Sequence, residues 1–493
     1  MSVKQVSVNM LFFVALFFFG CSEKPGDDAT SLDKTPVIFP DYTGITIPPN
    51  IAPLNFIIEE EGEKFFVKIS HGKEELEVSS DDGEVLIPQD KWHQLLENNS
   101  TTKLTYNIFV KRQGKWYRFK PYLNYLAKEN VNQYLFYRLL YPGYELWKEM
   151  GIYGRDVTSF KERPLIENKS VYNNCMNCHS FNQNSPETYM LHIRGDRGGT
   201  IIYKDGKVKK VNVKTKDMMS AGVYPSWHPN GRFIAYSTNK IQQLFHAQGK
   251  KFIDVFDQAS DMIVYDTGTE RVFSDSVLMS KNFMETFPCW APDGKSLYFT
   301  RAKQRTDTTF YKNIHYDLCR IPFDEKSKKF GEVEVIYPAS KYGKSVTLPR
   351  VSPDNRFVMF TLSDYGTFSI WHPEADLYLL NLKTMEAKRL DVNSDDVDSF
   401  HSWSSNGRWF VFSSKRLDSQ CARPFFAHID EDGNTTKPFV LPQQNPGFYN
   451  TFLKTFNRPE LVKGPFNFDT WKLVRQAAFK GQNVDPGTGK GHY

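Results

Sequence analysis

One turn motif recurs four times between residues 227 and 412, and it constrains the fold more than any other feature of the chain. Each copy contains the pattern Trp-x-Pro-Asp/Asn-Gly-Arg/Lys, or a close variant, followed by alternating apolar residues. The copies occupy residues 227–236, 290–299, 351–360 and 403–412. The Asp or Asn of the turn recurs after 63, 61 and 52 residues. A period of this kind predicts an array of similar structural units.

The chemistry of the motif predicts a β-hairpin in each copy. Asp-Gly and Asn-Gly favour the tight turn that joins two antiparallel strands, and the proline before them fixes the chain direction into the turn. The aromatic residue and the apolar run would bury one face of each unit. The third copy has Val351 in place of the tryptophan and Asn355 in place of the glycine, and the fourth has Ser405 in place of the proline.

Further alternating segments predict about four strands in each unit, which is the blade of a β-propeller. Segments 261–266 and 376–382 are examples, and a weaker unit at 199–211 precedes the first full copy. We therefore expect a mainly β protein with a propeller of about five to six blades over residues 199–442. Residues 443–493 would form a closing segment that packs on the propeller and ends in a tail.

The residues before the propeller divide into three regions by composition. Residues 21–50 are polar and proline-rich and predict a tether or linker. Residues 51–125 contain short alternating runs separated by turn residues, which predicts a β-sandwich-like domain without an assigned role. Residues 126–198 carry apolar residues at helix-like spacing, interrupted by Pro142-Gly143, and predict a short helical segment.

The first 20 residues have the pattern of an export signal. Lys4 is the positive charge, and the nine residues from Leu11 to Phe19 are apolar, which is shorter than the about 20 residues of a membrane span. Gly20-Cys21 resembles the end of a bacterial lipobox, and this implies lipidation of Cys21 and a stable membrane anchor. An ordinary cleaved signal peptide is the alternative. The expected location is the cell envelope, lipid-anchored, on the periplasmic side or the outer-membrane surface.

Residues 174–179 read Asn-Cys-Met-Asn-Cys-His and contain C-x-x-C-H, the signature of c-type haem attachment. Cys175 and Cys178 would add to the two vinyl groups of one covalent haem c, and His179 would be the proximal ligand of the iron. Export agrees with this interpretation, because c-type haem is attached outside the cytoplasm. The alternatives are a redox disulfide, a zinc site or a structural disulfide, but no βαβ context and no second C-x-x-C accompanies the motif.

Candidates for the distal iron ligand follow soon after the motif. Met190 and His192 lie 11 and 13 residues beyond His179 and would face the same side of an extended segment. More distant options are Met218, Met219 and His246. A five-coordinate iron that binds small ligands is a further alternative. Arg194 and Arg197 have side chains suited to the haem propionates, although solvated loop positions explain them equally well.

The turn repeats resemble those of TolB-like β-propellers, the WD40-like (PD40) repeat class, and the resemblance covers residues 190–442. The whole layout is similar to that of Bacteroidetes-type lipoproteins in which a haem-attachment motif precedes such a propeller. The resemblance implies a c-type haem protein with a propeller platform for a partner protein or a ligand.

These features leave three hypotheses for the function. The first is an exported, lipid-anchored haem protein in electron transfer or redox sensing, with an unidentified redox or envelope protein as partner. The second is a haem enzyme that acts on a small molecule such as peroxide, and the third is a non-catalytic binding propeller with a structural haem. The net charge of +5 is small for 493 residues and forms no basic stripe, which argues against a nucleic-acid partner. A disulfide between Cys289 and Cys319, with Cys421 unpaired, also remains open.

Overall fold

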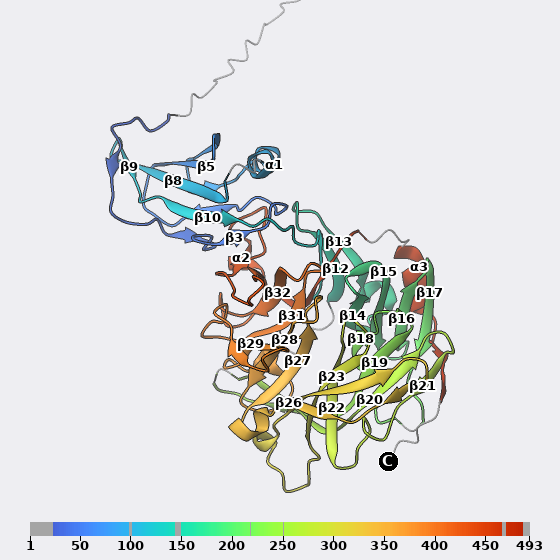
Figure 1. The fold of residues 1–493 in the computed structure, drawn as a ribbon. Helices are drawn as coiled ribbons and strands as arrows, with labels where there is room; N and C mark the ends of the chain where they lie inside the picture. The colour runs from blue at the N-terminus through green and yellow to red at the C-terminus, as the bar shows by residue number, and fades with distance from the viewer. Residues whose placement is uncertain are drawn as a thin grey trace, which may run out of the picture.

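The computed structural model describes residues 23–97, 101–142, 149–216, 218–249, 251–465 and 470–486, so the segment predicted to direct export and Cys21 lie outside the described residues. The chain forms an N-terminal β domain and a β-propeller that lie side by side (Figure 1). The mainly β fold class, with a sandwich-like domain followed by a propeller, is confirmed. Within the described ranges, no helix combines the length and the hydropathy that crossing a membrane requires.

The propeller has six four-stranded blades in the described part of the chain. Blade 1 consists of β35 (Thr455–Val462), β11 (Tyr134–Leu140), β12 (Met150–Asp156) and β13 (Glu162–Glu167). Blade 2 consists of β14 (Cys175–Asn182), β15 (Ser185–Arg194), β16 (Gly199–Lys204) and β17 (Lys207–Asn212). Blade 3 consists of β18 (Val223–Trp227), β19 (Phe233–Phe245), β20 (Ile253–Asp266) and β21 (Arg271–Phe273).

The remaining blades follow in chain order. Blade 4 consists of β22 (Phe283–Trp290), β23 (Ser296–Lys303), β24 (Asp317–Asp324) and, pairing the outer side of β24, β25 (Lys329–Phe330) and β26 (Glu334–Tyr337). Blade 5 consists of β27 (Ser345–Val351), β28 (Phe357–Ser363), β29 (Asp376–Asn381) and β30 (Ala387–Arg389). Blade 6 consists of β31 (Asp398–Trp403), β32 (Trp409–Ser414), β33 (Arg423–His428) and β34 (Phe439–Val440).

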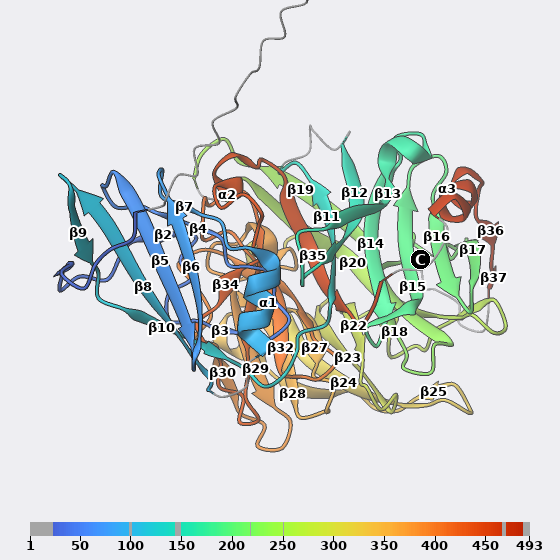
Figure 2. The same ribbon diagram turned by 90° about the horizontal axis from the view of Figure 1, so that it is seen from above.

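The C-terminal strand β35 closes the ring of blades. It pairs antiparallel with β11, which comes more than 300 residues earlier, and becomes the innermost strand of blade 1 (Figure 2). The six innermost strands, β35, β14, β18, β22, β27 and β31, then contact one another in a closed ring around the central channel. A strand from the far end of the chain thus closes the ring of blades.

The described residues of the helical segment expected at 126–198 form mainly strands instead. Leu135, Phe136 and Tyr137 are consecutive and fully buried, because β11 is covered on both faces by neighbouring blades. A strand buried on both faces has a continuous apolar run, which cannot be told from a helix by periodicity alone. The propeller therefore begins at residue 134 and not at 199, and the C-x-x-C-H motif lies inside blade 2.

The N-terminal domain encloses an apolar core between two sheets and one helix. The larger sheet contains β1 (Thr30–Ser31), β9 (Lys115–Arg118), β8 (Lys103–Arg112), β10 (Tyr122–Leu126), β3 (Thr46–Ile47), β5 (Lys64–His71) and β6 (Glu74–Ser80). The smaller sheet contains β2 (Ile38–Phe39), β4 (Phe56–Ile58) and β7 (Glu84–Val85), and the helix is α1 (Gln89–Glu97). Residues 30–47 thus belong to the domain and not to a tether, because Tyr42, Ile45 and Ile47 are buried in its core.

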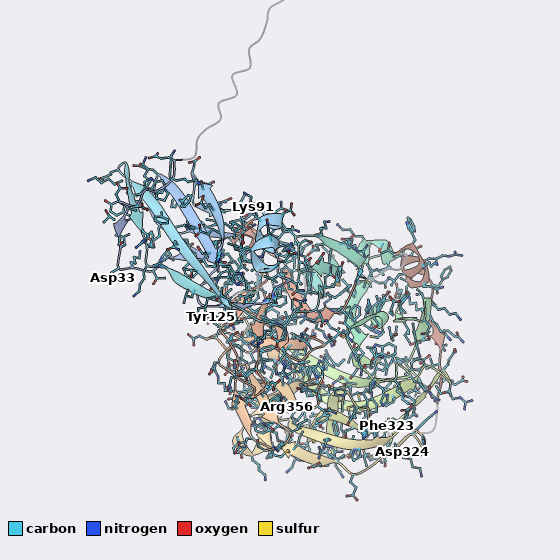
Figure 3. The ribbon with its side chains drawn as sticks, turned by 45° about the horizontal axis from the view of Figure 1, so that its top comes forward. Asp33, Lys91, Tyr125, Phe323, Asp324 and Arg356 are labelled. Carbon is cyan, nitrogen blue, oxygen red and sulfur yellow. The ribbon has the colours of Figure 1, made fainter. Side chains whose placement is uncertain are left out.

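The N-terminal domain and the propeller share one core. A single cluster of buried apolar residues runs from the domain into blades 5 and 6. The Tyr42 hydroxyl donates to the Val440 carbonyl at 3.3 Å, and the Asn55 amide donates to the Gln444 carbonyl at 2.9 Å. Figure 3 shows Asp33 and Lys91 on this domain and Phe323 and Asp324 at the far rim of the propeller. The domain is therefore an integral part of the fold.

Short helices complete the structure. They are α2 (Phe448–Thr451), α3 (Thr470–Ala478), η1 (Asn168–Val171), η2 (Tyr311–Asn313), η3 (Ala339–Tyr342) and η4 (Ser369–Trp371). After α3, β36 (Gln482–Asn483) and β37 (Asp485–Pro486) extend the outer edges of blades 2 and 3.

Replacing Trp409 with alanine should destabilise the shared core. Trp409 is fully buried in this cluster, and its indole N–H donates to the Glu129 carbonyl at 2.8 Å. We expect the free energy of unfolding to fall by about 3–5 kcal/mol, measured by urea unfolding followed by circular dichroism. Trp471→Ala is the matched control, because that side chain is 78% exposed. A Trp409 variant that unfolds at the same urea concentration as the control would contradict a stabilising shared core.

Candidate functional site

Every innermost strand contains a β-bulge at the same place. At each bulge two residues of the inner strand lie opposite one residue of the next strand, which bends the inner strand and redirects its side chains. The two-residue positions are 177–178, 224–225, 287–288, 348–349, 400–401 and 458–459. The bulges thus form a sixfold ring around the channel.

The first bulge residue has positive φ in five of the strands. These residues are Tyr224, Phe287, Leu348, Phe400 and Arg458, with φ between 45° and 54°. This conformation is strained for bulky side chains and persists only where the surrounding fold enforces it. The four apolar members meet in one cluster, and the rings of Tyr224 and Phe287 lie 4.3 Å apart. The cluster forms an apolar plug within the channel.

A sequence signal for this ring precedes each turn motif and was missed in the sequence-based prediction. The tetrapeptides are Tyr-Pro-Ser-Trp at 224–227, Phe-Pro-Cys-Trp at 287–290, Leu-Pro-Arg-Val at 348–351, Phe-His-Ser-Trp at 400–403 and Arg-Pro-Glu-Leu at 458–461. The matching tetrapeptide of β14 is Asn-Cys-His-Ser at 177–180. The second half of the C-x-x-C-H motif therefore occupies the bulge of blade 2.

The motif presents two thiols outside any disulfide and one histidine ring without a hydrogen-bond partner among the described residues. Cys175 and Cys178 are free thiols, and Cys178 is buried. His179 is 1% exposed, and neither of its ring nitrogens has a hydrogen-bond partner among the described residues. Burial, assisted by the charges of Arg458 and Arg138, lowers the pKa of His179 to about 3. The imidazole is therefore neutral, with a lone pair that no described residue uses.

Arginines surround the motif. Burial raises the pKa of the Cys178 thiol, but the charges of Arg458, Arg194 and Arg138 outweigh this effect, and the net pKa is below the ordinary value. The Arg138 guanidinium donates to the Met176 carbonyl at 3.2 Å. A lowered pKa favours the thiolate, which is the reactive form of cysteine.

The two thiols and the imidazole are the groups that a c-type haem needs. In the extended strand, however, they do not all point toward one place where a single porphyrin could lie. On β14, Cys178 lies beside Tyr224 of blade 3, while the His179 Nε2 lies 3.9 Å from the Glu460 Oε2 of blade 1. Adjacent residues of a strand point to opposite faces. Attachment with His179 as axial ligand therefore requires residues 175–179 to leave the extended conformation.

Met190 and His192 lie on the same face of β15, and this face is opposite to the one that carries His179. Met190 is buried in the core between blades 2 and 3. His192 lies opposite the bulge residues 177–178, and its Nδ1 lies 3.1 Å from the Thr200 hydroxyl. Of the more distant options, Met218 belongs to the same core as Met190, and His246 pairs with Asp254 at 2.8 Å.

The remaining cysteines are not joined to each other. Cys289, Cys319 and Cys421 are free and buried. Cys289 lies on β22 and Cys319 on β24, with β23 between them. The disulfide considered for Cys289 and Cys319 is therefore absent from these strands.

A cavity of about 310 Å³ opens at the mouth of the channel, beside the motif. The turn-motif tryptophans Trp227, Trp290 and Trp403 line it together with the prolines of the bulges and turns. The Trp227 indole N–H donates to the Ser180 carbonyl at 3.2 Å, and the Trp403 indole N–H donates to the Arg350 carbonyl at 3.1 Å. Each of these bonds joins one blade to its neighbour, which gives Trp227 and Trp403 a structural role.

The buried His401 at this cavity should make stability depend on pH. Its Nε2–H donates to the Met359 carbonyl at 2.9 Å, and burial, assisted by the charge of Arg350, lowers its pKa from 6.5 to about 3. Below pH 6.5 the unfolded chain binds a proton that the folded chain does not, so stability falls as the pH decreases toward 3. From pH 7 to pH 5 we expect His401 to account for a loss of about 2 kcal/mol.

Urea midpoints measured at pH 7 and pH 5 test this expectation. His401→Gln removes the titration and keeps an N–H donor, so its stability should change less between the two pH values than that of the unmodified protein. Identical pH dependence in both proteins would show that His401 does not contribute.

No protein-family model and no curated protein sequence matches this chain. Among solved structures, the Dos1 propeller is similar at 15% identity and a TM-score of 0.32, over 56% of this chain and 67% of that one. A nidogen/laminin complex is similar at 8% identity and a TM-score of 0.37, over 67% and 100%. A puromycin-hydrolyzing peptidase from Mycobacterium tuberculosis is similar at 11% identity and a TM-score of 0.37, over 70% and 52%. Likenesses this distant carry no argument about function, and the propeller rests on the strand order.

Proposed function

We propose that the chain is an exported, lipid-anchored c-type haem protein that acts in electron transfer or redox sensing, with its propeller as a platform for a partner. The observation that carries the proposal is the buried His179 imidazole, with both nitrogens unused, beside two free thiols in C-x-x-C-H. An unsatisfied buried polar atom costs about 1–3 kcal/mol. Ligation of an iron would remove that cost.

The residues that would hold the haem come from two neighbouring blades. Cys175 and Cys178 would carry it covalently, and His179 would ligate the iron. Arg194 and Arg138 would face the propionates, since guanidinium groups pair well with carboxylates. The bound haem would supply one-electron chemistry. Met190 and His192 are the candidates for the second iron ligand, and either would have to reach the iron from the face of β15 opposite to the one that carries His179.

Haem stoichiometry tests the proposal directly. The full chain is produced in a host with c-type cytochrome maturation, and a reduced pyridine haemochrome spectrum is recorded beside haem staining after denaturing electrophoresis. We expect one covalent haem per chain. A chain without covalent haem after production in such a host would refute the proposal.

The coordination of the iron separates electron transfer from small-molecule chemistry. A low-spin, six-coordinate spectrum that carbon monoxide does not alter supports electron transfer. A high-spin spectrum that shifts on addition of carbon monoxide or cyanide would instead support an enzyme or a ligand sensor, such as one that acts on peroxide.

The membrane anchor is tested by Cys21→Ser. The unmodified protein should be found in the membrane fraction with a lipid-modified N-terminus by mass spectrometry. The variant should lose the lipid and leave that fraction. Equal recovery of both proteins in the membrane fraction would exclude Cys21 as the anchor.

A further inference from the structure

We propose that the cavity at the mouth of the channel binds a small organic molecule that carries a carboxylate or a phosphate, with Arg350 and Arg458 as its ligands. This site goes beyond the proposed haem function and does not depend on it. The cavity is formed by residues of several blades, among them Ser226, Cys289, Arg350, Ser402 and Glu460, which are the residues two positions after the first bulge residue of their strands.

The charge of the cavity favours an anion. Its charged lining residues are Arg350, Arg458, Lys463 and Glu460. One oxygen of the single carboxylate is already engaged, because the Glu460 Oε1 accepts the Phe181 backbone N–H at 2.8 Å. The cavity thus has an excess of positive charge.

The two arginines form no direct ion pair in the described chain, although the Glu460 carboxyl lies close enough for its charge to act on both. Among the described residues, no salt bridge joins Arg350 or Arg458 to a carboxylate. The Arg350 guanidinium donates to the carbonyl of its neighbour Pro349 at 3.0 Å and also contacts the Cys289 thiol. The Arg458 Nη1 is buried and has no hydrogen-bond partner in the described chain. A guanidinium that is shielded from water and unpaired is well suited to bind a carboxylate or a phosphate in a bidentate manner.

The rest of the lining favours a ligand with a flat apolar part. Besides the tryptophans, Pro225, Pro229, Pro292, Pro353 and Pro459 line the cavity. Indole hydrogen bonds to neighbouring blades hold Trp227 and Trp403 in place, so the walls are formed before a ligand binds. A volume of about 310 Å³ lies within the range of small-molecule sites.

Isothermal titration calorimetry of the full chain with benzoate, phenyl phosphate and neutral benzamide tests the site. We expect at least one of the two anions to bind with a Kd below about 1 mM and benzamide to bind at least about tenfold more weakly. Arg350→Gln and Arg458→Gln should each weaken anion binding by about tenfold to a hundredfold, because each removes charge-assisted hydrogen bonds. Arg320→Gln on the outer part of blade 4 is the matched control and should bind like the unmodified protein. Thermal unfolding of each variant verifies that it is folded.

Three results would overturn the proposal. They are the absence of binding of both anions, equal binding of benzamide, and unchanged affinity in the two folded channel variants. The same titrations on the haem-free Cys175→Ala/Cys178→Ala variant keep the two proposals apart. Anion binding by the haem-free variant would support this site even if the haem assignment failed. Absence of anion binding in the unmodified protein that carries haem would refute this site alone.

Discussion

Changing both Cys175 and Cys178 to alanine is expected to abolish covalent haem while the propeller still folds. The thioether bonds of a c-type haem require these two sulfurs, and neither sulfur takes part in a disulfide. Removing them deletes little buried volume, so we expect a loss of only about 1 kcal/mol in the free energy of unfolding. Haem staining after denaturing electrophoresis measures covalent attachment, and circular dichroism measures folding.

The chain offers a matched control for this experiment. Cys289→Ala/Cys319→Ala removes two other buried, free thiols from blade 4 and leaves the C-x-x-C-H motif intact. This variant should retain one covalent haem. Covalent haem on the Cys175/Cys178 variant, or an equal loss of haem from the control, would mean that the C-x-x-C-H motif is not the specific site of attachment. If neither variant folds, both will lack covalent haem. The circular dichroism spectra would reveal this case.

The turn chemistry made most of the propeller predictable. In blades 3 to 6 the motif forms the hairpin between the first two strands, as expected from its Asp-Gly and Asn-Gly turns. Even the variant third copy follows the rule, because Asn355 adopts the positive φ of 58° that glycine adopts elsewhere. Local sequence is sufficient here, since a left-handed turn position restricts the residues that fit it.

Blades 1 and 2 were not predictable in the same way. Their first hairpins lack the turn motif, and the apolar run around Phe136 has no periodicity that distinguishes a strand from a helix. The pairing of β35 with β11 joins the two ends of the propeller and depends on contacts that no local pattern reports. The motif residues 175–179 were found from sequence as a chemical signature, but their place on an inner strand follows only from this global closure.

The candidate cavity, too, could be predicted from the sequence only in part. Arg350 occupies the repeat position that is Ser226 in blade 3, and Arg458 occupies the position that is Phe400 in blade 6. Because the residue type changes from blade to blade, it did not mark either position. Aligning the tetrapeptides before the turns would have placed both arginines at the channel. The absence of a carboxylate partner, which makes them a candidate anion site, depends on the direction in which Glu460 points and is a property of the folded structure.

Leu461→Asp should open the propeller at its closure. Leu461 is fully buried in the core that blades 1 and 6 share with the N-terminal domain, and its carbonyl accepts the Asn184 amide at 2.7 Å. The substitution removes the apolar side chain and buries an unpaired charge, with an expected loss of about 5 kcal/mol or more in the free energy of unfolding. Domains of this kind have about 5–15 kcal/mol in total. A large part of the molecules should therefore lose β35 from the ring.

Leu453→Asp makes the same chemical change eight residues earlier, at a side chain that is 68% exposed and lies just before β35. Its free energy of unfolding, measured by urea unfolding, should stay within about 0.5 kcal/mol of that of the unmodified protein. If closure by β35 holds the ring together, Leu461→Asp should also make blades 1 and 6 exchange backbone hydrogens faster than blade 4, because the ring opens next to β35. Uniform exchange in all blades would mean that the ring unfolds as a whole, and a midpoint equal to that of Leu453→Asp would mean that β35 does not stabilise the propeller.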